Sequence, residues 1–238
     1  MKIVTWNCNG AFRKKFREIE KFRADIYIIQ ECENPEFVIG EFKEWATNYR
    51  WVGTNKNRGL AIFANQQINL KSLDWASDNL ELFLPVRINN SFNLVGVWTK
   101  QANSPTFGYI GQLWKYLTLH KLRFSESTIL CGDFNSNKIW DVWDRWWNHS
   151  DVVRELEHVN MSSLYHRFTG EFQGEETRPT FFLQKKLEKP YHIDYAFATD
   201  DMFECNENVV ELFSPQEWLK FSDHIPLVFT IKARKEEH

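Results

Sequence analysis

The sequence predicts an α/β protein in which helices cover β-sheets. Short apolar runs of strand length recur along the chain, and some follow one another closely enough to form hairpins. Stretches with the apolar spacing of an amphipathic helix lie singly between these runs. A simple doubly wound sheet would alternate one strand with one helix, so this mixture of paired strands and isolated helices favours sheets packed beneath helices.

The N-terminal part of the chain begins with continuous apolar runs that are typical of buried strands. Between the first two runs, Phe12, Phe16 and Ile19 recur at helical spacing, with basic side chains on the remaining faces. The elements expected here are strands at Lys2–Trp6, Asp25–Gln30 and Gly59–Ala64 and a helix at Phe12–Phe22.

The middle of the chain is expected to contain a hairpin, because Asn89-Asn90-Ser91 is a run of turn formers between two apolar stretches. Helical spacing returns after it, and buried strands follow towards the C-terminus. The expected hairpin strands are Leu80–Ile88 and Phe92–Trp98, the expected helices are Gly111–Leu122, Trp140–Trp147 and Val152–His158, and the remaining expected strands are Ser127–Cys131, Thr180–Leu183, Ile193–Ala198, Val209–Phe213 and Pro226–Ile231.

The composition is that of one globular domain. The chain has 238 residues, of which 43% are hydrophobic, and it shows no internal repeat, low-complexity tract or Pro/Ser-rich linker. We therefore expect a single domain over residues 1–238. The net charge of −3 gives no global basic field, so binding to nucleic acid would need a local basic patch or a metal ion.

The sequence predicts a cytoplasmic protein with reduced thiols. The apolar run after Met1 is too short for a secretory signal, and no stretch approaches the roughly 18 apolar residues of a membrane span. Cys8, Cys32, Cys131 and Cys205 form no Cys-x-x-Cys pair. No pattern indicates an oligomeric state, and a monomer is assumed.

Acidic, amide and imidazole side chains recur where the expected strands begin or end, which is where α/β proteins build their sites. Each alone has an ordinary structural explanation as a turn former or helix cap. An Asp inside an apolar strand, such as Asp194, needs a partner, and His224 is the obvious one. The full set of candidates is Asn7, Glu31, Asp133, Asn135, Asp194, Asp223 and His224.

This set of residue types favours metal-assisted chemistry at phosphorus. The chain has no phosphate-binding Gly-x-x-x-x-Gly-Lys loop, no Gly-x-Ser-x-Gly elbow and no His-Glu-x-x-His zinc helix. Carboxylate and amide oxygens suit a hard cation such as Mg²⁺ or Mn²⁺, and an Asp, an Asn and a His beside it suit attack by water on a phosphoester. A glycosidase also needs two carboxylates, but it needs neither the Asp/His pair nor the amides.

Taken in order, these segments resemble one family. Thr5-Trp6-Asn7, Gln30-Glu31, Gly132-Asp133-Phe134-Asn135, Ile193-Asp194-Tyr195 and Ser222-Asp223-His224 look like the motifs of the endonuclease/exonuclease/phosphatase superfamily, at the ends of successive strands. The resemblance extends over nearly the whole chain and indicates a minimal, bacterial-type member. It implies a four-layer α/β/β/α sandwich, with two mixed sheets face to face and helices outside.

The resemblance also implies a role for each candidate. The residue that matches Glu31 is the main Mg²⁺ ligand in the family, assisted by those that match Asn7 and Asp223. The residue that matches Asp133 positions or deprotonates the attacking water. Those that match Asn135 and His224 contact the phosphate, and the one that matches Asp194 orients the imidazole.

Two positions depart from the pattern of the abasic-site endonucleases in this superfamily. Those enzymes carry a Tyr where this chain has Trp98, and an indole is only a hydrogen-bond donor. Three possibilities remain open: Trp98 donates to phosphate, Lys100 takes over that contact, or Trp98 only packs. Asn9 replaces a family Asp, which weakens a second metal position.

The substrate is less well defined by the sequence. The chain has several clusters of basic residues, and one of them contains Arg58. Such clusters are either solvated faces or contacts to a phosphate backbone. Trp140, Trp143 and Trp147 would share a buried helical face, leaving Trp146 free to stack on a base. We expect a Mg²⁺- or Mn²⁺-dependent nuclease acting on DNA or RNA. The alternatives are a phosphatase or phosphodiesterase acting on a small molecule or lipid headgroup, and a non-catalytic binding module.

Overall fold

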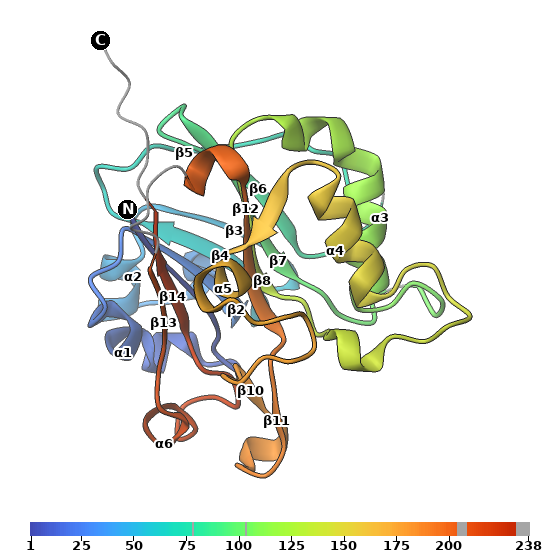
Figure 1. The fold of residues 1–238 in the computed structure, drawn as a ribbon. Coiled ribbons are helices and arrows are strands. Elements are labelled where there is room, and N and C mark those ends of the chain that lie inside the picture. Colours follow the sequence, from blue (N-terminus) through green and yellow to red (C-terminus); the bar gives the residue numbers. More distant parts are fainter. Residues whose placement is uncertain (78, 103, 204–208, 232–238) are drawn as a thin grey trace.

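The computed structural model describes residues 1–77, 79–102, 104–203 and 209–231, and it contains two six-stranded mixed sheets. The two sheets lie face to face with helices outside them, as Figure 1 shows. The predicted four-layer α/β/β/α sandwich is therefore confirmed.

The first sheet joins the two ends of the chain, because β1 pairs in parallel with β2 on one side and antiparallel with β14 on the other. In spatial order its strands are β13 (Val209–Leu212), β14 (Leu227–Thr230), β1 (Lys2–Asn7), β2 (Ile26–Cys32), β4 (Arg58–Ala64) and β3 (Tyr49–Asn55).

The second sheet comes from the middle of the chain, and its centre is the parallel pair of β7 and β8. In spatial order its strands are β5 (Leu70–Ser72), β6 (Phe83–Ile88), β7 (Phe92–Trp98), β8 (Thr128–Asp133), β12 (Asp194–Thr199) and β9 (Met161–Ser163). A separate small hairpin is formed by β10 (Phe181–Phe182) and β11 (Pro190–Tyr191).

Three apolar layers hold the sandwich together. Alternate residues of facing strands, such as Ile28 and Ile129, fill the core between the sheets, and Leu164 of α5 (Leu164–Thr169) packs into the same core. The outer face of the first sheet is covered by the short helices α1 (Phe16–Glu20), α2 (Glu41–Trp45) and α6 (Pro215–Trp218). The outer face of the second sheet is covered by α3 (Ile110–His120) and α4 (His149–Glu157).

The predicted helix at Phe12–Phe22 is wrong as a single element. A 3-10 turn at Phe12–Lys14 is followed by α1, with Lys15 in a non-helical conformation between them. The Lys15 ammonium donates to the carbonyl oxygens of Cys8 and Phe221, at 2.6 and 2.7 Å, which holds the break in place.

The predicted helix at Trp140–Trp147 is also wrong. A 3-10 turn at Lys138–Trp140 leads into an irregular loop, and Asn148 ends this loop by capping α4 together with Asp151. Consequently α4 begins earlier than the predicted Val152–His158. The expected buried indole face is absent too, since Trp143 is 97% exposed.

Other differences concern element ends and short elements. The strand expected at Leu80–Ile88 begins only at Phe83, and the one expected at Thr180–Leu183 is the two-residue β10. The helix expected at Gly111–Leu122 ends at His120 and continues as a 3-10 turn. Several elements had no clear signal in the sequence, because they are short or polar: β3, β5, β9, β11, α2, α5 and α6.

Within the described residues, every helix is too short or too polar to span a bilayer. Cys8, Cys32 and Cys131 are buried free thiols, and burial raises the pKa of each well above its ordinary value. Cys205 lies outside the described residues.

One glycine in the central strand β8 tests how tightly the two parallel strands pack. A Cβ added to Gly132 (φ +146°) would lie 1.9 Å from the carbonyl oxygen of Val97. We expect Gly132→Ala to lower the free energy of unfolding by about 3 kcal/mol, because neither strand can yield without disturbing the sheet. Urea unfolding would measure the loss.

The matched control is Gly170→Ala, at φ +75°, where no atom lies within 4 Å of an added Cβ. It should cost only the backbone strain of about 1 kcal/mol. Equal losses in the two variants would show that the close approach to Val97 carries no energetic weight.

Candidate active site

The alternation of side chains along the strands brings the predicted residues to one end of the space between the sheets. Asn7 lies on the same face of β1 as the core residue Ile3. Asp133 ends β8 on the face of Cys131, and Asp194 begins β12 on the face of Ala196. Asp133 and Asp194 are direct partners in the antiparallel β8–β12 register, so two carboxylates from neighbouring strands meet there.

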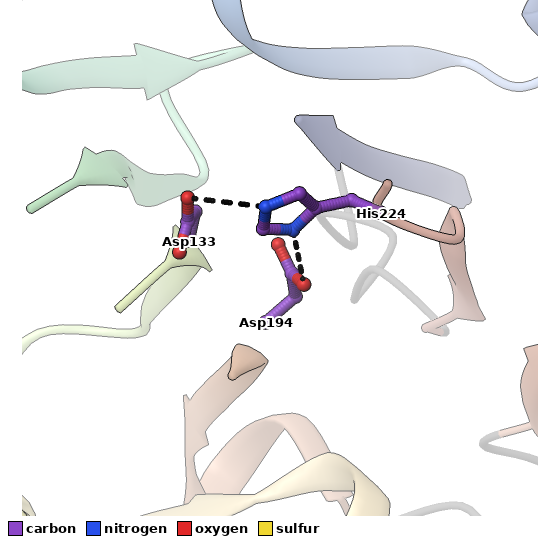
Figure 2. Close-up of side chains that lie close together, drawn as sticks. All are labelled: Asp133, Asp194 and His224. Atoms are coloured by element: carbon purple, nitrogen blue, oxygen red, sulfur yellow. Dashed lines mark hydrogen bonds and ion pairs between the residues drawn. The ribbon is translucent and has the colours of Figure 1, made fainter. Parts of the chain in front are cut away.

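His224 lies between these two carboxylates, as Figure 2 shows. Its Nδ1 is 2.9 Å from Oδ2 of Asp194, and its Nε2 is 3.9 Å from Oδ2 of Asp133. All three side chains are buried. The predicted pair of Asp194 and His224 is therefore present, and the hydrogen bond at Nδ1 leaves Nε2 turned towards Asp133.

The electrostatics of this group follow from burial and mutual attraction. Burial lowers the pKa of His224, but attraction to Asp194 and Asp133 outweighs burial and raises the pKa to about 9. Burial raises the pKa of Asp133 to about 7, opposed by the charge of His224. Attraction between the groups thus favours the charged imidazole, whereas burial favours the protonated form of Asp133.

Amide groups fix the Asp133 carboxylate in one orientation. Asn7 donates from Nδ2 to Oδ2 of Asp133 at 2.8 Å. Asn135 donates its backbone N–H to Oδ1 at 2.8 Å and its side-chain Nδ2 to Oδ2 at 3.0 Å. The structure thus brings Asn7, Asn135, Asp133, Asp194 and His224 into one group, in which an ion pair between His224 and Asp133 joins the hydrogen-bonded residues on its two sides.

The other predicted metal ligands lie at adjacent strand ends. Asn7 and Gln30 are partners in the parallel β1–β2 register, so Glu31 follows beside the end of β1. Glu31 sits at a β-bulge with φ +60°, which interrupts the alternation of β2. On the opposite side, Asn9 donates from Nδ2 to Oδ1 of Asp223 at 3.0 Å.

Arg58 forms an ion pair with Glu31 in this structure. Its Nε donates to Oε2 of Glu31 at 2.9 Å, and its Nη2 donates to the same oxygen. Among the described residues, Oε1 of Glu31 accepts no hydrogen bond. The predicted substrate residue Arg58 is therefore the counter-ion of the predicted main metal ligand.

Two sets of side chains offer donor atoms of a kind that divalent cations bind. Asp133, Asp194 and His224 offer ligand atoms that all lie within 4.8 Å of one another, and Oδ1 of Asp194 is buried with no hydrogen-bond partner among the described residues. A histidine ligand must be neutral, and attraction to the two carboxylates raises the pKa of His224 in the metal-free protein, so a metal ion bound here would have to displace that proton. Glu31, Asn7 and Asp223 offer only oxygens, which is what Mg²⁺ and Mn²⁺ prefer.

Trp98 and Lys100 lie close to the group but are engaged elsewhere. Trp98 is the register partner of Asp133, yet its indole is buried in the core between the sheets. The Lys100 ammonium lies 5.6 Å from the indole ring and 3.5 Å from a carboxylate oxygen of Glu81. A contact of either residue with phosphate stays a prediction.

The structure adds supporting residues that the sequence analysis missed. Thr180 Oγ1 accepts the backbone N–H of Asp194 at 3.0 Å, and the ring of Phe181 lies 4.7 Å from that of His224. Trp6 donates from Nε1 to the His224 carbonyl at 3.0 Å. Trp6 stands inside a recognised motif, but no pattern marked Thr180 or Phe181, since their roles arise only from the hairpin that places them.

Hydrolysis of phosphoric esters is the chemistry that this fold and this group of side chains support together. The sequence matches the Endonuclease/Exonuclease/phosphatase family over residues 4–224, so the chain belongs to that family. Comparison with curated protein sequences gives no match.

Solved structures with the same fold include an AP endonuclease from Archaeoglobus fulgidus, with a TM-score of 0.71, 18% identity, and coverage of 98% of this chain and 99% of that chain. The 3'-5' exonuclease NExo from Neisseria meningitidis has a TM-score of 0.67 and 18% identity, with 98% of this chain and 100% of that chain covered. A Neisseria 3' phosphatase NExo variant bound to a product DNA hairpin has a TM-score of 0.69 and 18% identity, covering 98% and 99% of the two chains. At this identity the likeness establishes the fold.

The Arg58–Glu31 contact generates a test of the metal site. We expect Arg58→Gln to tighten Mn²⁺ binding about 5-fold, because a partly exposed ion pair of up to about 1 kcal/mol no longer competes for the carboxylate. Calorimetric titration of the protein with Mn²⁺ would measure the change.

Lys56→Gln is the matched control. Lys56 belongs to the same exposed turn, but its ammonium lies over the ring of Phe37, 5.7 Å from the ring centroid. This variant should leave Mn²⁺ affinity unchanged. Weaker Mn²⁺ binding by Arg58→Gln would mean that Arg58 orients Glu31 for the metal and does not compete with it.

Proposed function

We propose that this protein is a nuclease that hydrolyses phosphodiester bonds of DNA or RNA with the help of Mg²⁺ or Mn²⁺. The observation that carries the proposal is the buried Asp133–His224–Asp194 group beside the oxygen donors Glu31, Asn7 and Asp223. The solved structures of like fold support it, because they include an endonuclease, an exonuclease and a phosphatase bound to DNA.

Glu31, Asn7 and Asp223 would hold the cation. When bound there, the cation supplies charge neutralisation at the phosphate oxygens and lowers the pKa of water. Arg58, Asn9 and Lys100 would contribute contacts to the substrate, as would Trp98 if its N–H reaches a phosphate oxygen. For Arg58 this requires release from Glu31, which frees a guanidinium for a phosphate.

Asp133 is the general base in this proposal. Its carboxylate is held by amide donors from Asn7 and Asn135, so it cannot turn away from an attacking water. A pKa near 7 suits a group that must accept a proton near neutral pH.

His224 is the phosphate-binding donor. The Nδ1–H of His224 donates a hydrogen bond to Asp194. The N–H at Nε2 is then left to donate to a non-bridging oxygen as negative charge develops there. Asn135 would join it, exchanging one of its side-chain bonds, to Asp133 or to the carbonyl of Thr99, for the phosphate. We further propose the cytoplasm as the compartment, which suits the free thiols of Cys8, Cys32 and Cys131.

The direct test is hydrolysis of a substrate panel by purified protein in Mg²⁺. The panel holds single-stranded DNA, duplex DNA with and without an abasic site, RNA and inositol polyphosphate. We expect cleavage of a nucleic acid that EDTA and Glu31→Ala abolish and that Asp133→Asn lowers by about 10²–10⁴-fold, the usual contribution of a general base.

Asp74→Asn, at an exposed position, is the control for loss of one carboxylate and should keep full activity. Cleavage of inositol polyphosphate alone would replace the nuclease with a small-molecule phosphatase. Full activity of Asp133→Asn would remove Asp133 from the role of base.

The pKa shifts predict a bell-shaped dependence of kcat/KM on pH. Activity should rise as Asp133 loses its proton around pH 7 and fall as His224 loses its proton around pH 9. Asp194→Asn should move the alkaline limb to lower pH, because attraction to Asp194 is the main interaction that raises the pKa of His224. Initial rates on the cleaved substrate at saturating Mg²⁺ would define both limbs.

The control Asp200→Asn, at an exposed carboxylate, should leave both limbs in place. If the alkaline limb does not move in Asp194→Asn, the loss of activity at high pH is not caused by deprotonation of His224.

A further inference from the structure

An exposed aromatic surface lies beside the active site, and the proposed mechanism does not use it. Three tryptophans of the loop formed by residues 138–147, here called the tryptophan loop, are open to solvent: Trp143 is 97%, Trp146 66% and Trp140 42% exposed. Indoles normally gain stability by burial, so three exposed ones in a single loop indicate a contact surface.

The tryptophan loop is continuous with the active site. It begins three residues after Asn135, and Asn137 anchors its beginning by donating from Nδ2 to the carbonyl of His192 at 2.9 Å and to the hydroxyl of Tyr195 at 3.0 Å. The tryptophan loop is therefore tied to the end of the second sheet at which Asn135 lies.

A row of aromatic rings joins the catalytic imidazole to the tryptophan loop. The ring of Phe181 lies 4.7 Å from that of His224, and the ring of Tyr191 lies 6.3 Å from that of Phe181. The ring of Trp140 lies 5.0 Å from that of Tyr191. Apart from His224, these rings come from the β10–β11 hairpin, which projects at the bottom of Figure 1, and from Trp140 near the start of the tryptophan loop.

The exposure of the indoles is built into the loop. Asn148 donates from Nδ2 to the carbonyls of Val142 and Arg145, at 2.9 and 2.8 Å, and its Oδ1 accepts the Arg145 guanidinium at 2.8 Å. The guanidinium also covers the ring of Trp147 at 4.4 Å, and Trp147 packs against the helices over the second sheet. The loop is thereby closed on its inner side, with Trp143 and Trp146 outside.

We propose that the tryptophan loop and the ring row bind unpaired bases of a single-stranded nucleic acid, so that the substrate is single-stranded where it leaves the site. This rests on the proposed nuclease function. Aromatic side chains stack on any base through its π-face, whereas paired bases in a duplex are already stacked on one another. The exposed lysines of the adjoining hairpin, Lys185, Lys186 and Lys189, are placed for the phosphates between those bases.

A lipid surface fits this loop less well. Asp144 is exposed between Trp143 and Arg145, and insertion of the loop would carry its carboxylate towards the hydrocarbon. Stacking needs only one face of each indole, so the carboxylate can stay in water.

The test is direct binding of labelled oligonucleotides, measured by fluorescence anisotropy. An Asp133→Asn background with EDTA present suppresses cleavage, and the probes are a 12-nucleotide oligo-dT, its oligo-U counterpart and a blunt duplex of the same length. Trp143→Ala and Trp146→Ala should each weaken single-strand binding about 5- to 100-fold, the range for loss of one stacked base, and change duplex binding less than 2-fold.

Trp143→Tyr and Trp143→Leu separate stacking from apolar contact. The tyrosine should keep most of the affinity, and the leucine should lose it although it is apolar. Leu119→Ala, which removes an exposed apolar side chain on α3, is the control and should have no effect.

Several results would overturn the proposal: unchanged single-strand affinity in both alanine variants, equal weakening of duplex and single strand, or retention of affinity by Trp143→Leu. Binding of phosphatidylcholine–phosphatidylserine vesicles that depends on Trp143 would make the loop a membrane contact. A dimer at micromolar concentration that is lost in Trp143→Ala would make it a contact between copies.

The outcome is separable from that of the nuclease proposal. Trp-dependent single-strand binding with no cleavage of any panel member would sustain the stacking surface and reject the nuclease. Cleavage of nucleic acid with no dependence on the tryptophan loop would do the reverse.

Discussion

The contact between His224 and Asp194 holds the candidate active site together. Asp133 and Asp194 are fully or almost fully buried at 0% and 1% exposure, and two carboxylates so close in a dry place repel each other. One protonated imidazole between them makes their burial tolerable. Removing one partner of such a group leaves an uncompensated buried charge, which typically costs about 3–5 kcal/mol. The arrangement is therefore maintained only as a complete set.

This group also depends on segments that are far apart in the chain. The Trp6 indole binds the carbonyl of His224, and Ser222 donates from Oγ to the carbonyl of Asn7 at 2.7 Å. The first and last strands thus fix each other at the point where the site begins. The hairpin of β10 and β11 then closes the site from the side through Phe181. These contacts between the first strand, the last strand and the hairpin define the fold around the site, and the tryptophan loop is not part of them.

Local patterns in the sequence predicted sheets covered by helices and the candidate residues at strand ends, whereas the four-layer arrangement and the role of each candidate came from the resemblance to the family. Apolar alternation identifies strands, and Asp133 or Asp194 at a strand end is visible without a structure. What the sequence could not show depends on distant contacts. The break at Lys15 comes from a bond to the carbonyl of Phe221, and the pairing of Arg58 with Glu31 depends on a bulge. The spacing of Trp140, Trp143 and Trp147 is helical, but Asn148 stabilises a loop in its place.

The buried cysteines have a practical consequence. Only a thiolate reacts readily with alkylating or oxidising reagents, and the raised pKa values and complete burial of Cys8, Cys32 and Cys131 leave almost none in the folded protein. Cys8 and Cys32 lie under the helices of the first sheet, and Cys131 lies between the sheets. Their rate of labelling therefore measures how often the sandwich opens, and each thiol reports on the layer in which it lies.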